Sequence, residues 1–184
     1  MLYTRKGDGG TTKTFGCDQR VSKSSNIAEA LGTLDEINSY LGVCRTRSVG
    51  MVFDAGIGKI DYPKIIFNIQ QNLFIVQAEL AGSDMSMTPE KVKEVEFFID
   101  GIEKELPPIK SFFISGSDEI SAMFDFARTL SRRAERRVVG VSEEGKVKVG
   151  KDTLAYMNRL SSILYAFARY ASFKAGVVEE RPHY

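Results

Sequence analysis

The chain has 184 residues, of which 43% are hydrophobic and 27% are charged, and its formal net charge is +1. This balance is typical of a globular protein with one domain, and it argues against a protein that coats nucleic acid or binds an anionic membrane surface. No apolar run approaches the length of about 18 residues that a membrane span needs. The N-terminus has no signal-peptide pattern, so we expect a cytoplasmic protein.

Histidine and cysteine are scarce, which excludes several kinds of site. The only histidine is His183. A Ser-His-Asp or Cys-His nucleophile and a histidine-rich metal site are therefore not expected. The two cysteines, Cys17 and Cys44, are too few for a disulfide framework or a zinc site. We interpret them as small apolar residues rather than as a redox pair.

The first 25 residues differ in composition from the rest. Residues 3–14 contain three glycines, four threonines and three basic residues, and Lys23 follows just before the first expected helix. Glycines let backbone N–H groups turn toward a ligand, hydroxyl groups donate hydrogen bonds and lysines supply positive charge, so the composition suits a phosphate. The segment is not a Walker A loop. A flexible polar arm is the alternative interpretation.

Apolar residues at spacings of three and four predict five helices. We expect these helices at about 26–47, 63–80, 89–106, 118–140 and 152–174. Asn26 with Glu29 resembles a capping box. Ser117 is the expected N-cap of the fourth helix, with Asp118 and Glu119 as acids of its first turn, and Asp152 is the expected cap of the fifth. Residues 48–61 read as a connection, and residues 111–117 as a strand stub or an extended loop. No strand pairs are expected.

The predicted fold class is all-α, an antiparallel five-helix bundle. We expect a single domain over residues 1–184. It consists of an N-terminal loop (1–25), the helical bundle (26–176) and a C-terminal tail (177–184). In the last helix, a second polar line accompanies the apolar stripe. It consists of Asn158, Ser162, Tyr165 and Arg169.

Residues 125–137 carry the most distinctive pattern. An apolar stripe recurs at helical spacing: Ile120, Met123, Ala127, Leu130, Ala134 and Val138. Another face brings together Arg128, Arg132, Glu135 and Arg136. These arginines repel one another unless an anion or a partner lies there, and guanidinium groups suit phosphate, so the face predicts an anion site. A solvated, salt-bridged helix surface is the alternative. Asp35 in the first helix is either an exposed acid or the partner of an arginine.

Three motifs occur in order along nearly the whole chain: Tyr3–Thr12, Ala127–Arg137 and Tyr156–Ser162. A fourth, Gly32–Asn38, lies in the first expected helix. Together they resemble the ATP:cob(I)alamin adenosyltransferases of the propanediol-utilisation type. The Arg-Arg-Ala-Glu-Arg run combined with the Gly-Asp-x-Gly-x-Thr start makes this resemblance specific.

The resemblance implies a homotrimer that binds ATP and a corrinoid at each subunit interface. It implies transfer of the 5′-deoxyadenosyl group of ATP to reduced cobalamin, release of triphosphate and assistance by Mg²⁺, whose ligands it leaves unassigned. The residues implied to wrap the triphosphate are Thr4, Lys6, Gly7, Gly10, Thr11, Thr12 and Lys23. Those implied to hold the nucleotide are Arg132, Glu135, Arg136 and Asn158. Arg128 is implied to pair with Asp35 of the partner subunit, and Phe112 to occupy the lower face of the corrin.

The chemistry of these residues agrees with that activity. Cobalt(I) is a strong nucleophile, so the protein needs no histidine base and has to position the ribose 5′ carbon and neutralise the leaving triphosphate. Glu135 suits magnesium or a ribose hydroxyl better than proton transfer. Excluding a lower axial ligand makes cobalt(II) easier to reduce, which is the role that we expect for Phe112.

Three departures from the family pattern leave an alternative open. Ser162 stands where an aspartate is usual, residues 115–117 replace Pro-Gly-Gly, and the tail lacks the usual pattern. A non-catalytic trimer that carries or senses ATP or a corrinoid is therefore the second hypothesis. A purely structural bundle does not explain the glycine-rich start. Candidate partners are a corrinoid reductase and an adenosylcobalamin-dependent enzyme; nucleic acid and membrane are not expected.

Overall fold

The computed structural model describes residues 3–14, 19–54 and 58–184, so Cys17 lies outside the described residues. The described chain is mostly helical. Its five helices are α1 (Asn26–Arg47), α2 (Tyr62–Leu80), α3 (Pro89–Glu105), α4 (Glu119–Glu144) and α5 (Lys151–Ala175). The predicted helical fold with five helices is thus confirmed. Among the described helices, none combines the length and the apolar character that crossing a membrane requires.

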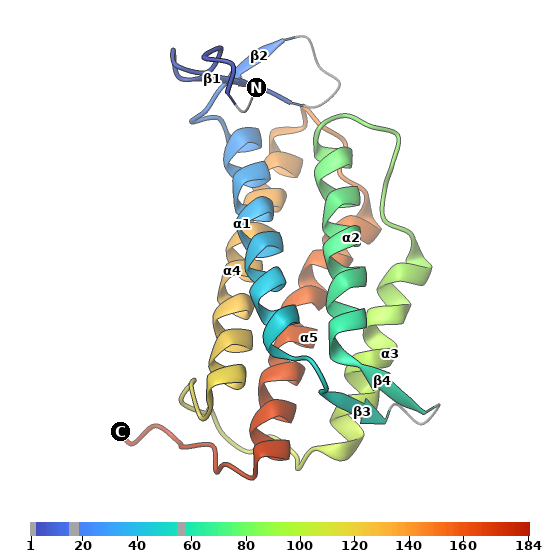
Figure 1. The fold of residues 1–184 in the computed structure, drawn as a ribbon. Helices are drawn as coiled ribbons and strands as arrows, with labels where there is room; N and C mark the ends of the chain where they lie inside the picture. The colour runs from blue at the N-terminus through green and yellow to red at the C-terminus, as the bar shows by residue number, and fades with distance from the viewer. Residues whose placement is uncertain (1–2, 15–18, 55–57) are drawn as a thin grey trace.

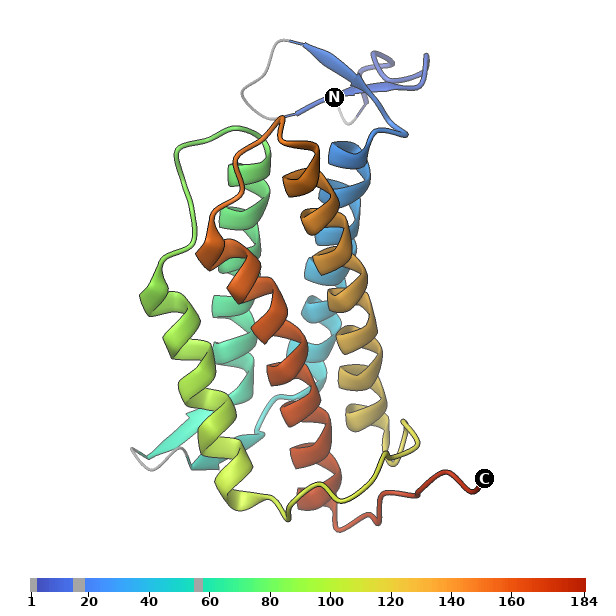
Figure 2. The ribbon, with the colours of Figure 1, turned by 180° about the vertical axis from the view of Figure 1, so that it is seen from behind.

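The helices lie side by side around α5 (Figures 1 and 2). Helix α4 packs between α1 and α5, while α2 packs on α1 and α3 packs on α5. Most neighbours run in opposite directions, but α3 and α5 run in the same direction (Figure 2). The arrangement gives α5 partners on two sides, which buries most of its length and leaves few of its side chains facing solvent.

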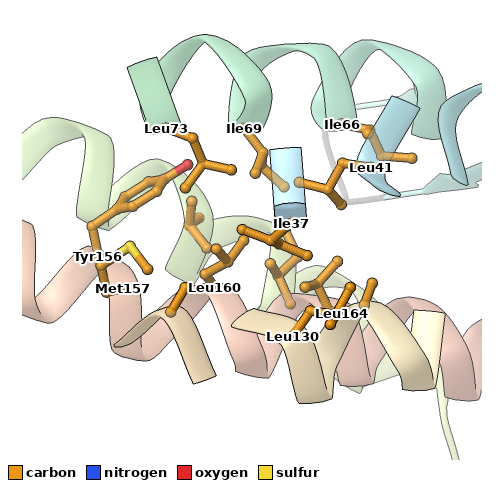
Figure 3. Packing of buried hydrophobic residues seen from close by; sticks show 14 of the residues in the cluster. Ile37, Leu41, Ile66, Ile69, Leu73, Leu130, Tyr156, Met157, Leu160 and Leu164 are labelled. Carbon is orange, nitrogen blue, oxygen red and sulfur yellow. The ribbon is translucent and has the colours of Figure 1, made fainter. Parts of the chain in front are cut away.

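The core forms where the apolar stripes of the helices meet (Figure 3). Ile37 of α1, Ile69 of α2 and Leu160 of α5 are almost completely buried there. Each such side chain contributes about 1.5–3 kcal/mol of hydrophobic stabilisation. Contacts between aromatic rings extend the core toward the C-terminal end of α5, where the ring centroids of Tyr62 and Phe167 lie 4.4 Å apart. This packing fixes the relative positions of α4 and α5, which carry the polar residues considered below.

Two short antiparallel hairpins contradict the expectation of no strand pairs. Strand β1 (Thr11–Lys13) pairs with β2 (Arg20–Ser22), and β3 (Val52–Asp54) pairs with β4 (Lys59–Asp61). Each strand has three residues. A segment of this length is too short to show the apolar–polar alternation by which a strand is recognised. Residues 111–117 form an irregular connection without a strand.

The helix ends differ from the prediction at three places. The N-cap of α1 is Ser25 rather than Asn26, and its hydroxyl accepts a hydrogen bond from the Ala28 N–H at 3.4 Å. The N-cap of α4 is Asp118 rather than Ser117, and the helix continues past Gly140 to Glu144. It ends where Gly145 adopts a left-handed conformation with φ of 68°, which glycine tolerates best.

A glutamate of α2 caps the start of α5, where Asp152 was expected. The N-cap is Gly150, which has no side chain to offer. Its N–H donates to Glu79 Oε1 at 2.6 Å, and the Thr153 hydroxyl donates to the other oxygen of the same carboxylate. The buried Glu79 therefore ties the end of α2 to the beginning of α5. The local sequence of α5 gives no sign of this contact.

Candidate functional site

A cavity of about 600 Å³ opens between α4, α5 and the connection of residues 106–118. Its volume is in the range of small-molecule sites. The residues of α4 and α5 that line it are Ser121, Asp125, Arg128, Arg132, Ser161, Ser162, Tyr165, Ala168, Arg169 and Ser172. The connection contributes Phe112 and its neighbours. The structure thus brings Phe112, Arg128 and Arg132 to one cavity, and Ser162 lies on the same wall.

Phe112 is 80% exposed, which is unusual for a large aromatic side chain beside a cavity. Asp125 of α4 faces this part of the connection, with the Ser115 hydroxyl and the Gly116 N–H as nearby donors. Burial raises the pKa of Asp125, while these donors and Arg128 act in the opposite direction. The arrangement leaves an apolar ring available to a ligand at this cavity.

Arg128 is half-buried against α5. Its Nε lies 3.7 Å from Asp125 Oδ1, and its guanidinium carbon lies 5.8 Å from the centroid of the Tyr165 ring. At that distance the ion pair is not a hydrogen bond, so the buried Nε–H has no hydrogen-bond partner in the described part of the chain. Asp35 is exposed on α1 and forms no ion pair with Arg128 within the described chain. The pairing of these two residues across subunits stays a prediction.

The arginines of α4 divide into a paired set and an unpaired set. Arg133 forms an ion pair with Glu36 of α1, and Arg137 lies 3.7 Å from Glu29 of α1. Arg132 and Arg136 are exposed and make no ion pair or hydrogen bond with any residue that the structure describes. Two neighbouring positive charges without a partner favour an anion at this face. The alternative hypothesis of a solvated, salt-bridged helix surface fits only Arg133 and Arg137.

Glu135 and Asn158 belong to a polar chain that crosses three helices. The Asn158 amide donates to Glu135 Oε1 at 2.9 Å, and Arg159 donates to Asn158 Oδ1 at 2.7 Å. Arg159 also donates to Glu96 Oε1 of α3 at 2.8 Å. Sequence reasoning missed the roles of Arg159 and Glu96. The position of Arg159 directly after Asn158 was a weak sign that it belongs to the site. Nothing in the sequence indicated a role for Glu96.

The N-terminal segment forms a loop that is held together by hydrogen bonds. Its seven predicted phosphate ligands, Thr4, Lys6, Gly7, Gly10, Thr11, Thr12 and Lys23, lie on or beside the β1–β2 hairpin. Arg20 donates to the Thr11 carbonyl and hydroxyl oxygens, both at 2.8 Å, and to the Lys6 carbonyl. The Lys23 N–H donates to the Gly10 carbonyl at 2.9 Å. Arg20, which sequence reasoning missed, closes this loop.

Glycine matters at two positions of the loop. Gly10 has a φ of 75°, a conformation that other residues rarely adopt. A Cβ atom on Gly7 would lie 3.2 Å from the Lys23 ammonium nitrogen, so the lysine packs directly on that glycine. The structure thereby sets a lysine beside the loop backbone, as the phosphate-binding hypothesis requires.

Within one chain, the candidate residues form two separate groups. The hairpin lies at one end of the molecule, and the connection that carries Phe112 lies at the other (Figure 1). None of the described hydrogen bonds, ion pairs or cavity linings joins the hairpin to Arg132, Glu135 or Arg136. No group of three or more acidic, histidine or cysteine residues in the described segments is arranged to hold a metal ion.

A family model described as cobalamin adenosyltransferase matches residues 2–171. The corrinoid adenosyltransferase PduO of Citrobacter freundii is 39% identical over 175 residues, which cover 91% of this chain and 49% of that protein. The chain therefore spans about half the length of that relative. The corrinoid adenosyltransferase of Bacillus subtilis (strain 168) is 34% identical over 180 residues, 96% of this chain and 89% of that protein.

A solved structure gives a similar result for the fold. It is a variant of the PduO-type ATP:corrinoid adenosyltransferase from Lactobacillus reuteri complexed with cobalamin and ATP. The two chains superpose with a TM-score of 0.84 at 26% identity, and the match covers 100% of both.

Proposed function

Because the chain belongs to the cobalamin adenosyltransferase family, we propose that it transfers the 5′-deoxyadenosyl group of ATP to cob(I)alamin. In this reaction the electron pair of cobalt(I) attacks the ribose 5′ carbon and a cobalt–carbon bond forms. The bond from that carbon to the triphosphate oxygen breaks, and triphosphate leaves with its electrons. The products are adenosylcobalamin and triphosphate.

The observation that carries the proposal is the unpaired Arg132 at the edge of the cavity that Phe112 borders. A guanidinium beside an apolar ring suits a reaction between an anionic nucleotide and a flat corrin. Each charge-assisted hydrogen bond to a phosphate oxygen is worth about 1.5–3 kcal/mol. Donors aimed at the leaving triphosphate lower the barrier, since negative charge develops there as the carbon–oxygen bond breaks.

We assign the nucleotide to both groups of candidate residues. The hairpin loop with Lys6 and Lys23 binds the triphosphate, and Arg132, Arg136 and Asn158 hold the nucleotide. Glu135 keeps one carboxylate oxygen on Asn158 and has the other available for a ribose hydroxyl or a magnesium ion. Mg²⁺ is usually held by one or two carboxylates together with substrate phosphates. This donor set fits magnesium that arrives with ATP, with Glu135 as the candidate carboxylate.

A homotrimer with one site at each subunit interface accounts for the two separate groups. A second copy of the chain would bring its hairpin to the Arg132 face of the first. The partner subunit's Asp35 would supply the partner that the buried Arg128 Nε–H lacks among the described residues of its own chain. Analytical ultracentrifugation tests this assembly, for which we expect a mass three times the 20.5 kDa of one chain.

One observation favours a second function, a protein that binds ATP and a corrinoid without turnover. Ser162 lies on the cavity wall at the position where the family pattern usually has an aspartate. Measuring triphosphate and adenosylcobalamin after anaerobic incubation separates the two functions. Turnover gives equal amounts of both products, and these decrease in Arg132→Ala but not in the matched control Arg133→Ala. Tight ATP binding without either product would establish the non-catalytic alternative.

A further inference from the structure

Arg169 of α5 connects three segments of the chain at the cavity. Its side chain is only 5% exposed, and its Nε donates to Glu179 Oε2 in the C-terminal tail at 3.2 Å. Both terminal nitrogens lie 3.4 Å from the Pro107 carbonyl oxygen, at the long end of the hydrogen-bond range. The guanidinium carbon lies 5.1 Å from the centroid of the Phe113 ring. One buried cation thus joins α5, the connection and the tail.

A backbone hydrogen bond reinforces this junction. The Ile114 N–H donates to the Glu180 carbonyl at 2.8 Å, so the tail is attached to the connection by main chain as well as by side chain. The contacts to Pro107, Phe113 and Ile114 flank Phe112 on both sides in sequence. Phe112 is itself 80% exposed, so packing of its own ring does little to fix its position.

We propose that the Arg169–Glu179 ion pair is a latch that positions Phe112 for the corrinoid. This inference rests on the proposed function, and it makes both residues positioning residues rather than groups that touch the reacting atoms. The side chain of Arg169 is 5% exposed and that of Glu179 is 18% exposed. Such a pair keeps its geometry, because separating the two residues would leave an uncompensated charge in a region of low dielectric constant. Asp125 lies near the later part of the connection, at Ser115 and Gly116, whereas the contacts of Arg169 lie on both sides of Phe112 in sequence.

The test compares Glu179→Gln with the matched control Glu180→Gln. Both remove one negative charge from the same tail, but the Glu180 side chain forms no ion pair or hydrogen bond with the described residues. Amide hydrogen exchange at Ile114 reports whether the tail stays attached. We expect exchange at Ile114 to speed up about tenfold or more in Glu179→Gln and to stay unchanged in the control, since a charge-assisted bond is lost.

Kinetics then distinguish positioning from a general loss of stability. We expect the KM for cobalamin to rise about tenfold in Glu179→Gln, the size of one charge-assisted hydrogen bond, while the KM for ATP stays within about twofold of wild type. Arg169→Met should have the same two effects if it folds, and Glu179→Gln carries the test if it does not. Unchanged Ile114 exchange in Glu179→Gln would refute the latch. Faster exchange with an unchanged cobalamin KM would refute its positioning role.

Turnover of the wild-type protein shows whether a negative result refutes this inference or the proposed function. Absence of adenosylcobalamin in the wild-type reaction would refute the proposed activity and with it the positioning of Phe112 for that reaction. Exchange at Ile114 would still decide whether the latch exists. Normal wild-type turnover combined with unchanged exchange and unchanged KM values in Glu179→Gln would refute the inference alone.

Discussion

The side-chain amide of Asn158 on α5 donates a hydrogen bond across 2.9 Å to the carboxylate of Glu135 on α4. This contact orients the one acidic side chain on the arginine face of α4. We expect Asn158→Ala to raise the KM for ATP about tenfold, the size of one charged hydrogen bond, with little loss of stability because Asn158 is exposed. Asn158→Asp should raise it further, since two carboxylates would face each other. An unchanged KM for ATP in both variants would show that Glu135 needs no orientation.

Phe112→Ala should reduce turnover without weakening ATP binding. The ring is 80% exposed, so its removal should change the free energy of unfolding by less than about 0.5 kcal/mol. The expected defect lies in the corrinoid half of the reaction, where the apolar ring keeps a ligand away from the lower face of cobalt. Turnover is measured under anaerobic conditions and ATP binding by calorimetry. Normal turnover in the variant would exclude this role.

Glu79→Ala tests the cap that α2 supplies to α5. The side chain of Glu79 is 6% exposed and accepts hydrogen bonds from the Gly150 N–H and the Thr153 hydroxyl. Its removal leaves both donors unsatisfied, so we expect a loss of about 3 kcal/mol in the free energy of unfolding. Urea denaturation measures the loss, and Glu180→Ala in the exposed tail is the control. A loss below about 1 kcal/mol, the size of one ordinary hydrogen bond, would contradict the capping role.

Cys44 makes stability depend on pH above neutrality. The thiol is 1% exposed, and burial raises its pKa to about 12. In the unfolded chain the pKa of this thiol is about 8.5. The folded state therefore holds the proton more tightly, so this stabilising contribution is complete below about pH 8.5 and is lost as the pH rises from there toward about 12.

The comparison of wild type with Cys44→Ala isolates that contribution. Urea denaturation in the presence of a reducing agent, at pH 7 and pH 10, gives the stability difference between the two proteins. We expect the advantage of wild type to shrink by about 2 kcal/mol at pH 10, which follows from about 1.4 kcal/mol per pH unit above the unfolded pKa. A constant advantage would mean that the folded thiol ionises as it does in water.

The helices could be predicted because their signal is local. Ile37, Leu130 and Leu160 each belong to an apolar stripe at helical spacing in a different helix, and all three lie in the core. The same periodicity grouped Ser162, Tyr165 and Arg169, which line one cavity in the structure. The hairpins were missed because three-residue strands have too few positions to show alternation.

The partners of the polar residues could not be predicted, because they depend on chain segments that are distant in sequence. Arg133 differs from Arg132 because it pairs with Glu36, and these two partners are 97 residues apart in sequence. Glu79 caps Gly150 across 71 residues, and Arg169 meets Pro107 across 62. Composition indicated an anion face on α4 but could not say which of its arginines were already neutralised. That distinction needs the packing of α1 on α4.

The proposed reaction forms a cobalt–carbon bond from ATP and reduced cobalamin. The most direct measurement follows the absorbance of chemically reduced cobalamin with ATP and Mg²⁺ under anaerobic conditions, with and without the protein. We expect a protein-dependent product that reverts on illumination, and a strong loss of its formation in Arg132→Ala. Spectra that stay the same with and without the wild-type protein would refute the proposed transfer.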